Sequence, residues 1–468
     1  MRFIDRDTEL RCLQAKWEEK SSQLMIIYGK RRVGKTELIK RFLEGKPAVY
    51  FLGDKRSSLE QLRELGALIG AHFGDSLLAR RGFSNWLEVF QYLGEKVSDP
   101  FILAVDEYPY IVEAEKNVSS VFQKGWDEYL KDKPVFLILC GSSVAMMESQ
   151  ALVYTSPLYG RRTGQLLLKP LSFEDARGFF PHKSFSQFLE LFTVAGGLPA
   201  YLIRMDPQCP LEENIKTKIF PRTEFLHNEM EFILKEELRE PGNYLSILRA
   251  VSFGKRKFGE ISNETGLGKN VLTKYINVLE RLLLLEKEVP VTERNPAKSK
   301  KGLYRVDDNF ARFWFQYVFP HKSDLELGRF DGALEKLRQS FSLLESQVYE
   351  RVCAGLLWKF QDSIFPFKRV GRWWNRLAEI DLVGLDEGTG QIVFGEAKWS
   401  NKPVGVETYR QLREKAALVD WGGPQRKEHY ALFGKNGFTD ELKRIAGHEP
   451  LHLFHQDKLL GGRSPGSI

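Results

Sequence analysis

The run from residue 29 to residue 36 has the residue types and spacing of a loop that binds phosphate groups. It satisfies the pattern G-x-x-x-x-G-K-[ST]. Its residues are Gly29, Lys30, Arg31, Arg32, Val33, Gly34, Lys35 and Thr36. In such a loop, backbone N–H groups and the start of the following helix point at the phosphates. Lys35 then reaches the β- and γ-phosphates and the Thr36 hydroxyl ligates Mg²⁺, so we predict a site for ATP and Mg²⁺.

Two acidic residues, Asp106 and Glu107, follow the apolar run Phe101–Val105 downstream of this loop. A buried strand ending here would deliver Asp106 to the Mg²⁺ shell, and Glu107 beside it would polarise the attacking water. We therefore predict that Asp106 binds the nucleotide's metal and that Glu107 is catalytic.

Three further residues are candidates for sensing or contacting the nucleotide. Ser142 follows the apolar run Val135–Cys140 and either senses the γ-phosphate or caps a helix, since serine is favoured at both places. Arg161 and Arg162 are candidates for an arginine that faces the phosphates in cis or in trans. The alternative for both arginines is a solvated surface position.

A second set of reactive residues lies near the C-terminus. Residues 378–383 and 391–399 are expected to be neighbouring strands of a hairpin, and side chains alternate along a strand, so Glu396 and Lys398 share a face. Pairing would bring Asp381 alongside them. Two carboxylates could then hold Mg²⁺ or Mn²⁺, while the lysine orients a water or stabilises a charged transition state. An upstream helix would supply a further acid, with Glu350 preferred over Glu345.

Two basic segments could contact nucleic acid. Residues 292–305 contain Arg294, Lys298, Lys300, Lys301 and Arg305 against a single acid, Glu293. They follow a predicted helix that starts with Lys269, Asn270, Thr273 and Lys274. Such a wing beside a helix either contacts DNA phosphates or packs against the rest of the protein. In residues 368–376, basic residues alternate with Trp373 and Trp374, which either stack on bases or form a buried pair.

The spacing of apolar residues predicts the strands and helices that position these residues. Strands are expected at 24–28, 48–52, 101–105 and 135–140, with helices between them, which is typical of a parallel α/β sheet. Residues 171–240 have helical periodicity, and Pro241-Gly242 suggests a boundary. Helices at 243–253, 258–265 and 269–285 and a strand at 303–306 indicate a winged helix-turn-helix.

The fold class expected is α/β with four domains. These are a parallel-sheet P-loop ATPase domain (1–170), a helical lid (171–240), a winged helix-turn-helix (241–320) and an α/β restriction-endonuclease-like domain (321–468).

Segments spread over residues 3–173 resemble the prokaryotic, especially archaeal, P-loop ATPases of the AAA+/STAND group. The segments are FIDRDTEL, YGKRRVGKTELI, LAVDEYPY, LILCGSSVAMM and SPLYGRRTGQLLLKPLSF. Gly197-Leu198-Pro199 also resembles the G-x-P turn by which the STAND lid contacts nucleotide. The resemblance therefore implies that Pro199 contacts the nucleotide, and the alternative is an ordinary turn between helices.

The C-terminal pattern D…E-x-K resembles the PD-(D/E)xK, or restriction-endonuclease-like, fold, although Ile380 stands where the nominal motif has proline. The order of the domains is similar to a family of archaeal and bacterial ATPases whose C-terminal region is usually uncharacterised. That likeness rests on GRWWN, EIDLV and FGEAKWS.

Composition excludes several classes of protein. The 468 residues carry a net charge of +7, with 28% charged and 43% hydrophobic residues, which excludes wholesale disorder. No apolar run approaches the ~20 residues of a membrane-spanning helix, and Met1–Leu10 is too charged for a secretory signal. The four cysteines form no C-x-x-C pair, which fits a reducing cytoplasm.

Together these features predict a cytoplasmic ATP-hydrolysing switch coupled to DNA binding. The C-terminal domain would either cleave DNA with a divalent metal or bind it without cleavage. ATP could also drive assembly of a homo-oligomer. The alternatives are a nucleotide-gated scaffold with an inactive nuclease-like domain that binds partners, and a transcription regulator that uses only the winged helix.

Overall fold

The computed structural model describes residues 4–238 and 240–460, so Phe3 of the segment FIDRDTEL lies outside the described residues. The chain forms two compact units. The first comprises Met1–Leu171 together with Leu198–Tyr201, and the second comprises Ser172–Gly197 and Leu202–Ile468. The chain therefore leaves the first unit, returns to it for four residues and leaves again. The further predicted divisions at 240 and 320 stay predictions.

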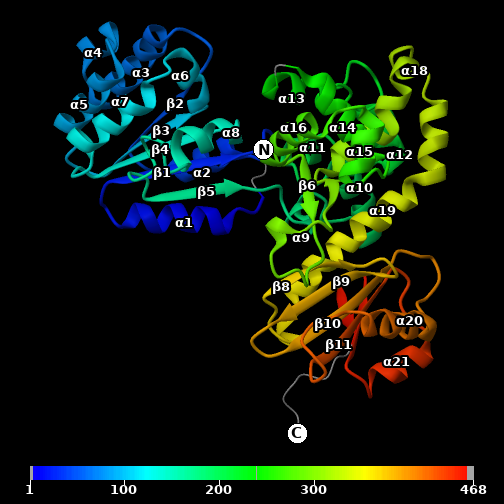
Figure 1. The fold of residues 1–468 in the computed structure, drawn as a ribbon. Coiled ribbons are helices and arrows are strands. Elements are labelled where there is room, and N and C mark those ends of the chain that lie inside the picture. The colour runs from blue at the N-terminus through cyan, green and yellow to red at the C-terminus, as the bar shows by residue number, and fades with distance from the viewer. Residues whose placement is uncertain (1–3, 239, 461–468) are drawn as a thin grey trace. The chain divides into compact units, whose positions relative to one another are not determined.

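The first unit is built on a parallel sheet with strand order β2-β3-β4-β1-β5 (Figure 1). Its strands are β1 (Gln23–Gly29), β2 (Ala48–Leu52), β3 (Phe101–Asp106), β4 (Val135–Gly141) and β5 (Gly164–Leu168). The predicted parallel α/β sheet is confirmed. Strand β5 was not predicted; it lies at the edge of the sheet, and most of its residues are only half-buried.

Helices cover both faces of this sheet. They are α1 (Asp7–Glu18), α2 (Lys35–Leu43), α3 (Ser58–Phe73), α4 (Ser76–Arg81), α5 (Trp86–Lys96), α6 (Tyr108–Ala114), α7 (Val118–Gly125) and α8 (Val144–Met147), with π-helical turns η1 (Trp126–Leu130) and η2 (Glu148–Leu152).

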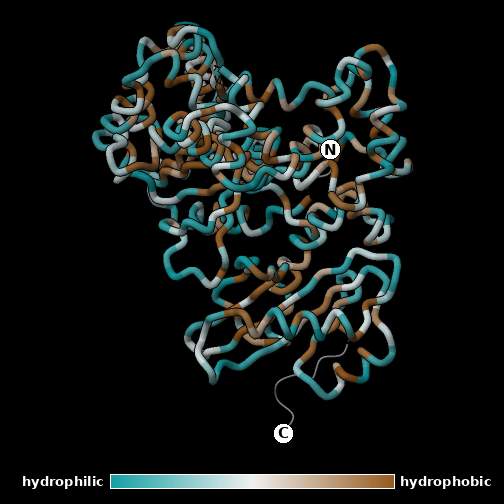
Figure 2. Tube along the Cα trace, turned by 45° about the vertical axis from the view of Figure 1, so that its right-hand side comes forward, coloured by the Kyte–Doolittle hydropathy of each residue, from teal (hydrophilic) through white to brown (hydrophobic). Residues whose placement is uncertain are grey.

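The alternation of side chains along the strands decides which helices pack on which face. Leu24, Leu103 and Leu137 join one core with α3, α5 and α7. On the other face, Phe136 contacts Trp17 of α1 and Phe42 of α2 through their rings. Figure 2 shows hydrophobic stretches of the chain running through this unit between hydrophilic ones. Because both faces are covered, the strands read as continuous apolar runs.

The second unit begins with helices, as the sequence indicated. They are α9 (Phe173–Ala176), η3 (Arg177–Phe179), α10 (Phe185–Ala195), α12 (Leu211–Lys218), α13 (Glu229–Glu237) and α14 (Pro241–Ser252), while α11 (Pro199–Leu202) starts in the first unit. Pro241 starts α14, a position where its missing N–H costs no hydrogen bond, and the domain boundary expected at Pro241-Gly242 stays a prediction.

Helix α14 is followed by α15 (Phe258–Thr265), α16 (Lys269–Arg281), β6 (Leu285–Glu288), η4 (Pro296–Lys298) and β7 (Leu303–Val306). Strands β6 and β7 pair antiparallel. The prediction that the third helix extends to Leu285 was wrong. The chain turns at Leu283, which has φ 56°, and Leu285 starts β6, because the run of leucines suits a helix and a strand equally.

The rest of the second unit is a helical segment and a mixed sheet of order β13-β12-β11-β10-β9-β8. Its elements are α17 (Asn309–Phe313), η5 (Trp314–Val318), η6 (Phe319–His321), α18 (Lys322–Glu326), α19 (Asp331–Lys359), η7 (Gln361–Ser363), β8 (Arg369–Trp374), β9 (Glu379–Asp386), β10 (Gln391–Lys398), α20 (Val406–Ala417), β11 (Lys427–Gly434), α21 (Asp440–Ala446), β12 (Leu451–His455) and β13 (Lys458–Leu460). Helix α19 packs on one face of the sheet, and α20 and α21 pack on the other.

We predict that Gly29→Ala destabilises the first unit by about 1–3 kcal/mol, because a methyl group there must be forced into a filled space. A Cβ on Gly29 would lie 2.3 Å from the Leu168 carbonyl oxygen of β5, at a backbone φ of +154°. Thermal unfolding measures the effect. Gly160→Ala is the matched control, since nothing lies within 4 Å of its added Cβ; equal melting temperatures for the two variants would contradict the prediction.

Candidate functional site

The phosphate-binding loop connects β1 to α2, as the motif requires. Gly34 has φ +93°, a conformation that side chains rarely adopt, and it directly precedes the first residue of α2. Lys35 is buried, and its Nζ donates hydrogen bonds of 3.0 Å to the carbonyl oxygens of Gly29 and Lys30. Burial lowers the pKa of Lys35. Its ammonium group is thus held inside the curl of the loop, where a phosphate would compete with the carbonyls for its hydrogen bonds.

Asp106 brings the loop and the neighbouring strands together. Its carboxylate is fully buried at the end of β3 and accepts hydrogen bonds at Oδ2 from the Thr36 hydroxyl, at 2.7 Å, and from the Tyr50 hydroxyl, at 2.8 Å. The predicted metal pair, Thr36 and Asp106, is therefore in direct contact. An oxygen pair of this type suits Mg²⁺, which is held by few protein ligands and by substrate phosphates.

Tyr50 of β2 is a site residue that sequence reasoning missed. Burial and the charge of Asp106 raise the pKa of Tyr50, so its hydroxyl stays protonated and donates to the carboxylate. The only signal in the sequence was that Tyr50 lies on an expected strand. That strand, β2, pairs with β3 and places Leu52, two residues after Tyr50, opposite Asp106.

Glu107 and Ser142, predicted separately from two strand ends, are hydrogen-bonded to each other. The Ser142 hydroxyl donates to Glu107 Oε1, and β3 and β4 are adjacent parallel strands, which is why their ends meet. Glu107 has φ 51° and precedes α6, and its N–H donates to Asp106 Oδ1 at 2.9 Å. The serine thus holds the carboxylate that we expect to orient water; Ser143, and not Ser142, is the N-cap residue of α8.

Pro199 lies against the loop. The segment Leu198–Tyr201 groups with the first unit, and a Cβ on Gly34 would lie 3.9 Å from Pro199 Cγ. Contact between Pro199 and the nucleotide, which the G-x-P resemblance implied, stays a prediction.

Arg161 and Arg162 both have structural partners in the first unit. Arg161 forms an ion pair of 2.9 Å with Asp127 of η1. Arg162 donates 3.2 Å hydrogen bonds to the Ala151 and Leu152 carbonyls at the end of η2. A role as an arginine that faces the phosphates stays a prediction for either residue.

The C-terminal candidates lie on two adjacent strands. Strands β9 and β10 form the predicted antiparallel hairpin, with Leu382 opposite Gly395. Asp381 Oδ2 accepts a 3.1 Å hydrogen bond from the Ala397 N–H, and Lys398 Nζ donates at 2.9 Å to Glu396 Oε1. Burial opposes the charge of Lys398, but the hydrogen bond to Glu396 and the charges of Glu396, Asp381 and Glu350 together outweigh it and raise the pKa of Lys398. The structure thus brings Asp381, Glu396 and Lys398 together.

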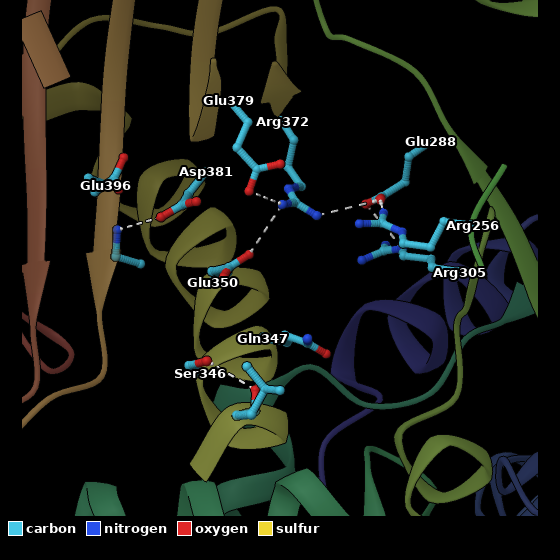
Figure 3. A network of polar contacts seen from close by, with 12 residues as sticks. Arg256, Glu288, Arg305, Ser346, Gln347, Glu350, Arg372, Glu379, Asp381 and Glu396 are labelled. Atoms are coloured by element: carbon cyan, nitrogen blue, oxygen red, sulfur yellow. Dashed lines mark hydrogen bonds and ion pairs between the residues drawn. The ribbon is translucent and has the colours of Figure 1, made fainter. Parts of the chain in front are cut away.

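Glu350 of α19 lies near this group. It is the acid that the sequence analysis preferred over Glu345. Burial and the charge of Asp381 raise the pKa of Glu350 to about 7, and burial and Glu396 raise the pKa of Asp381 to about 6. Figure 3 shows Glu350 and Asp381 on neighbouring elements, with Arg372 3.9 Å from Glu350. Crowded carboxylates of this kind favour either a proton or a cation.

Lys415 of α20 and Arg372 of β8 were missed as members of this site. Lys415 Nζ donates to both oxygens of Glu396, each at 3.1 Å. Arg372 was assigned to a base-contacting surface, but it forms a 3.3 Å ion pair with Glu379. No signal in the sequence connects Lys415 to Glu396, since the contact depends on how α20 packs on β10.

Within residues 4–238 and 240–460, no group of three or more His, Cys, Asp or Glu side chains has metal-binding geometry. A metal held by the two carboxylates of Asp381 and Glu396 would therefore take its remaining ligands from substrate and water. None of the helices in the described part of the chain combines the length and apolar character needed to cross a bilayer.

The predicted nucleic-acid segments are only partly exposed. Lys269, Asn270, Thr273 and Lys274 are exposed on α16, and so are four basic residues of the β6–β7 loop, Arg294, Lys298, Lys300 and Lys301. Arg305 differs from these residues: it lies on β7 of the hairpin and is half-buried in ion pairs with Glu286 and Glu288, so its contact with DNA phosphates stays a prediction. Trp373 is 5% exposed and packs in the core, so it does not stack on bases.

Two known families match this chain. Residues 3–205 match an ATPase domain found predominantly in archaea. Residues 314–414, which run from η5 into α20, match archaeal and bacterial proteins of unknown function.

The chain is also similar to two curated proteins and to one solved structure. An uncharacterized protein of Methanocaldococcus jannaschii is 34% identical over 438 residues, which is 92% of this chain and 95% of that protein. A second protein of that organism, described as ATP-binding, is 57% identical over 44 residues, 9% of this chain and 75% of its own. The Walker-type ATPase of Pyrococcus abyssi covers 67% of this chain and 96% of its own, with a TM-score of 0.51 and 23% identity, which shows a shared fold.

We predict that the two carboxylates of Glu350 and Asp381 make the metal-free protein less stable as pH rises from about 4 to about 7. The pKa of Glu350, about 7, and that of Asp381, about 6, lie above those of unfolded chains, so the folded state binds protons more strongly and loses about 1–3 kcal/mol as they ionise. Chemical unfolding in EDTA across this range measures the loss.

The control is Asp381→Asn, which removes one charge of the pair and keeps the size of the side chain. Its loss of stability over the same pH range should be smaller than that of the wild type. An equal or larger loss would contradict the assigned coupling.

Proposed function

The chain belongs to the family of ATPases found predominantly in archaea, and we propose that it is an Mg²⁺-dependent ATP-hydrolysing switch. The observation that carries this proposal is the contact between Thr36 and Asp106, with Glu107 next in sequence. ATP phosphates would bind the loop and Lys35, and Mg²⁺ would be held by Thr36 and Asp106. Glu107, positioned by Ser142, would orient the attacking water.

The path of the chain suggests how a nucleotide signal would leave the first unit. Pro199 contacts the loop through Gly34, while the residues on both sides of the 198–201 segment belong to the second unit. A nucleotide that displaces this segment would therefore pull on α10 and on the chain after Leu202. Binding energy would be converted into a rearrangement through this short connection.

We further propose that the second unit acts on DNA and cleaves it with the help of a divalent metal. Support comes from the arrangement of Asp381 and Glu396 on paired strands, with Lys398 beside Glu396 and Glu350 on the preceding helix, as the PD-(D/E)xK resemblance requires. Mg²⁺ or Mn²⁺ at the carboxylates would activate water, and Lys398 would stabilise the developing charge.

The helices α14–α16 and the β6–β7 hairpin support a winged helix-turn-helix in DNA binding. The exposed Lys269 and Lys274 of α16 and the exposed basic residues of the loop would contact phosphates. A nucleotide-dependent homo-oligomer is compatible with the same proposal.

The second candidate is a nucleotide-gated scaffold in which the carboxylate site binds partners without cutting DNA. The observation that favours it is that Glu396 is saturated by ion pairs with Lys398 and Lys415, which would compete with a metal.

We predict that Glu107→Gln binds ATP with unchanged affinity and hydrolyses it at least about 100-fold more slowly, because the amide cannot accept a proton from water. Fluorescent nucleotide titration and phosphate release measure the two effects. Glu113→Gln on α6 is the control, since it changes an exposed glutamate away from the site and should keep full turnover. Unchanged hydrolysis in Glu107→Gln would refute the role of Glu107.

We predict that Lys398→Ala abolishes Mg²⁺- or Mn²⁺-dependent nicking of a plasmid while leaving ATP hydrolysis intact. Lys402→Ala, in the exposed turn that follows, is the matched control and should cut like the wild type. If the wild type does not cut under any metal, the scaffold candidate is favoured. If Lys398→Ala cuts as well as wild type, the catalytic assignment fails.

A further inference from the structure

An open cavity of about 950 Å³ lies in the second unit, apart from the ATPase site. It is lined by the end of α14, the strands β6 and β7 of the predicted wing, the helix α19 and the strands β8 and β9. Arg256, Arg305, Arg312, Arg351 and Arg372 line it, and so do Glu350 and Asp381 of the carboxylate site. The cavity and the predicted cleavage site thus share a wall (Figure 3).

Most of these arginines are neutralised by acids. Arg256 pairs with Glu288, Arg305 lies 2.6 Å from Glu286, and Arg351 lies 2.9 Å from Asp307. Figure 3 shows Arg256 and Arg305 side by side at Glu288.

Arg312 is the exception. Its side chain donates to the side-chain amide oxygen Oε1 of Gln347, and within residues 4–238 and 240–460 it forms no ion pair. Burial and the nearby charges of Arg351, Arg305 and Arg256 lower the pKa of Arg312 to about 9, and burial lowers that of Arg256 and Arg351. Guanidinium groups gathered in this way favour an anion among them, and a phosphate accepts several of their forked hydrogen bonds at once.

The cavity also offers apolar surface. Phe253 is 51% exposed and Leu343 is 64% exposed, and both line it. An exposed ring beside phosphate-binding arginines is the combination by which proteins hold unpaired nucleotides, with a base stacked and its phosphate paired.

The volume of the cavity limits the kind of ligand that it can hold. A volume of about 950 Å³ is at the upper end of the ~300–1,000 Å³ that proteins use for small molecules, so it admits a few unpaired nucleotides and excludes a double helix.

From these observations we propose that the arginine cavity binds the end of a single-stranded DNA segment, with Arg312 on a phosphate and Phe253 on a base, and feeds that strand to Asp381 and Glu350. This inference rests on the proposed action of the second unit on DNA and specifies its substrate as an unpaired end or flap. The wing would hold the adjoining duplex.

The test is fluorescence anisotropy with three probes, in EDTA so that no strand is cut. The probes are a short single-stranded DNA, the same sequence as a blunt duplex, and the duplex with a single-stranded overhang. The first and third should bind at least about tenfold more tightly than the blunt duplex. Equal affinity for the blunt duplex would overturn the inference, and this measurement on the wild type requires no variant to fold.

Arg312→Gln should weaken binding of the single-stranded probe by about 10- to 100-fold, the effect of losing a charged hydrogen bond to phosphate. Arg312→Lys should recover part of the affinity. Arg444→Gln, which changes an exposed arginine of α21, is the matched control and should bind like the wild type. Circular dichroism checks that each variant is folded. A folded Arg312→Gln with wild-type affinity would overturn the inference.

The outcomes separate this inference from the proposed cleavage. If the protein selects single-stranded DNA through Arg312 but cuts no DNA with any metal, the binding site stands and the cleavage proposal fails. If it cuts DNA and Arg312→Gln binds and cuts equally well, cleavage stands and the inference fails.

Discussion

The buried carboxylate of Asp106 is the constraint on which the nucleotide site depends. A fully buried charge must be hydrogen-bonded or paired, and here the hydroxyls of Thr36 and Tyr50 supply the hydrogen bonds. The two donors lie on helix α2 and strand β2, and the carboxylate lies on strand β3. The parallel sheet makes their meeting possible, because its strands all end at one edge. Glu107 and Ser142 meet at the same edge for the same reason.

The second unit is governed by a different electrostatic problem, the crowding of like charges. Burial and neighbouring acids raise the pKa values of Glu350 and Asp381, and burial and neighbouring arginines lower the pKa of Arg312. Arg372 lies between the two groups, within 3.9 Å of both Glu350 and Glu288. A metal among the acids and a phosphate among the arginines would relieve both repulsions. A metal bound to the acids and a DNA phosphate bound to the arginines would thus occupy neighbouring parts of one surface, which connects cleavage with strand binding.

Much of the nucleotide site was predictable, because local sequence determines it. The loop motif needs only a strand before it and a helix after it, and both were visible as apolar patterns. The hairpin around Glu396 and Lys398 was visible in the same way. The prediction of a helix up to Leu285 failed because a run of leucines suits a helix and a strand equally. Arg305 looked like a free wing residue because its partners on β6 could not be seen from spacing alone.

What the sequence by itself determined is the chemistry within single segments: the glycines, lysine and threonine of the loop, the acid after β3, and the E-x-K pair on β10. These depend on short-range geometry, in which spacing along the chain sets spacing in the structure. Only the tertiary structure decided which distant side chains share a charge environment. The contacts of Tyr50 with Asp106, Lys415 with Glu396 and Arg312 with Gln347 come from elements packed against one another. Packing is set by whole apolar faces, so no local motif marks these partners.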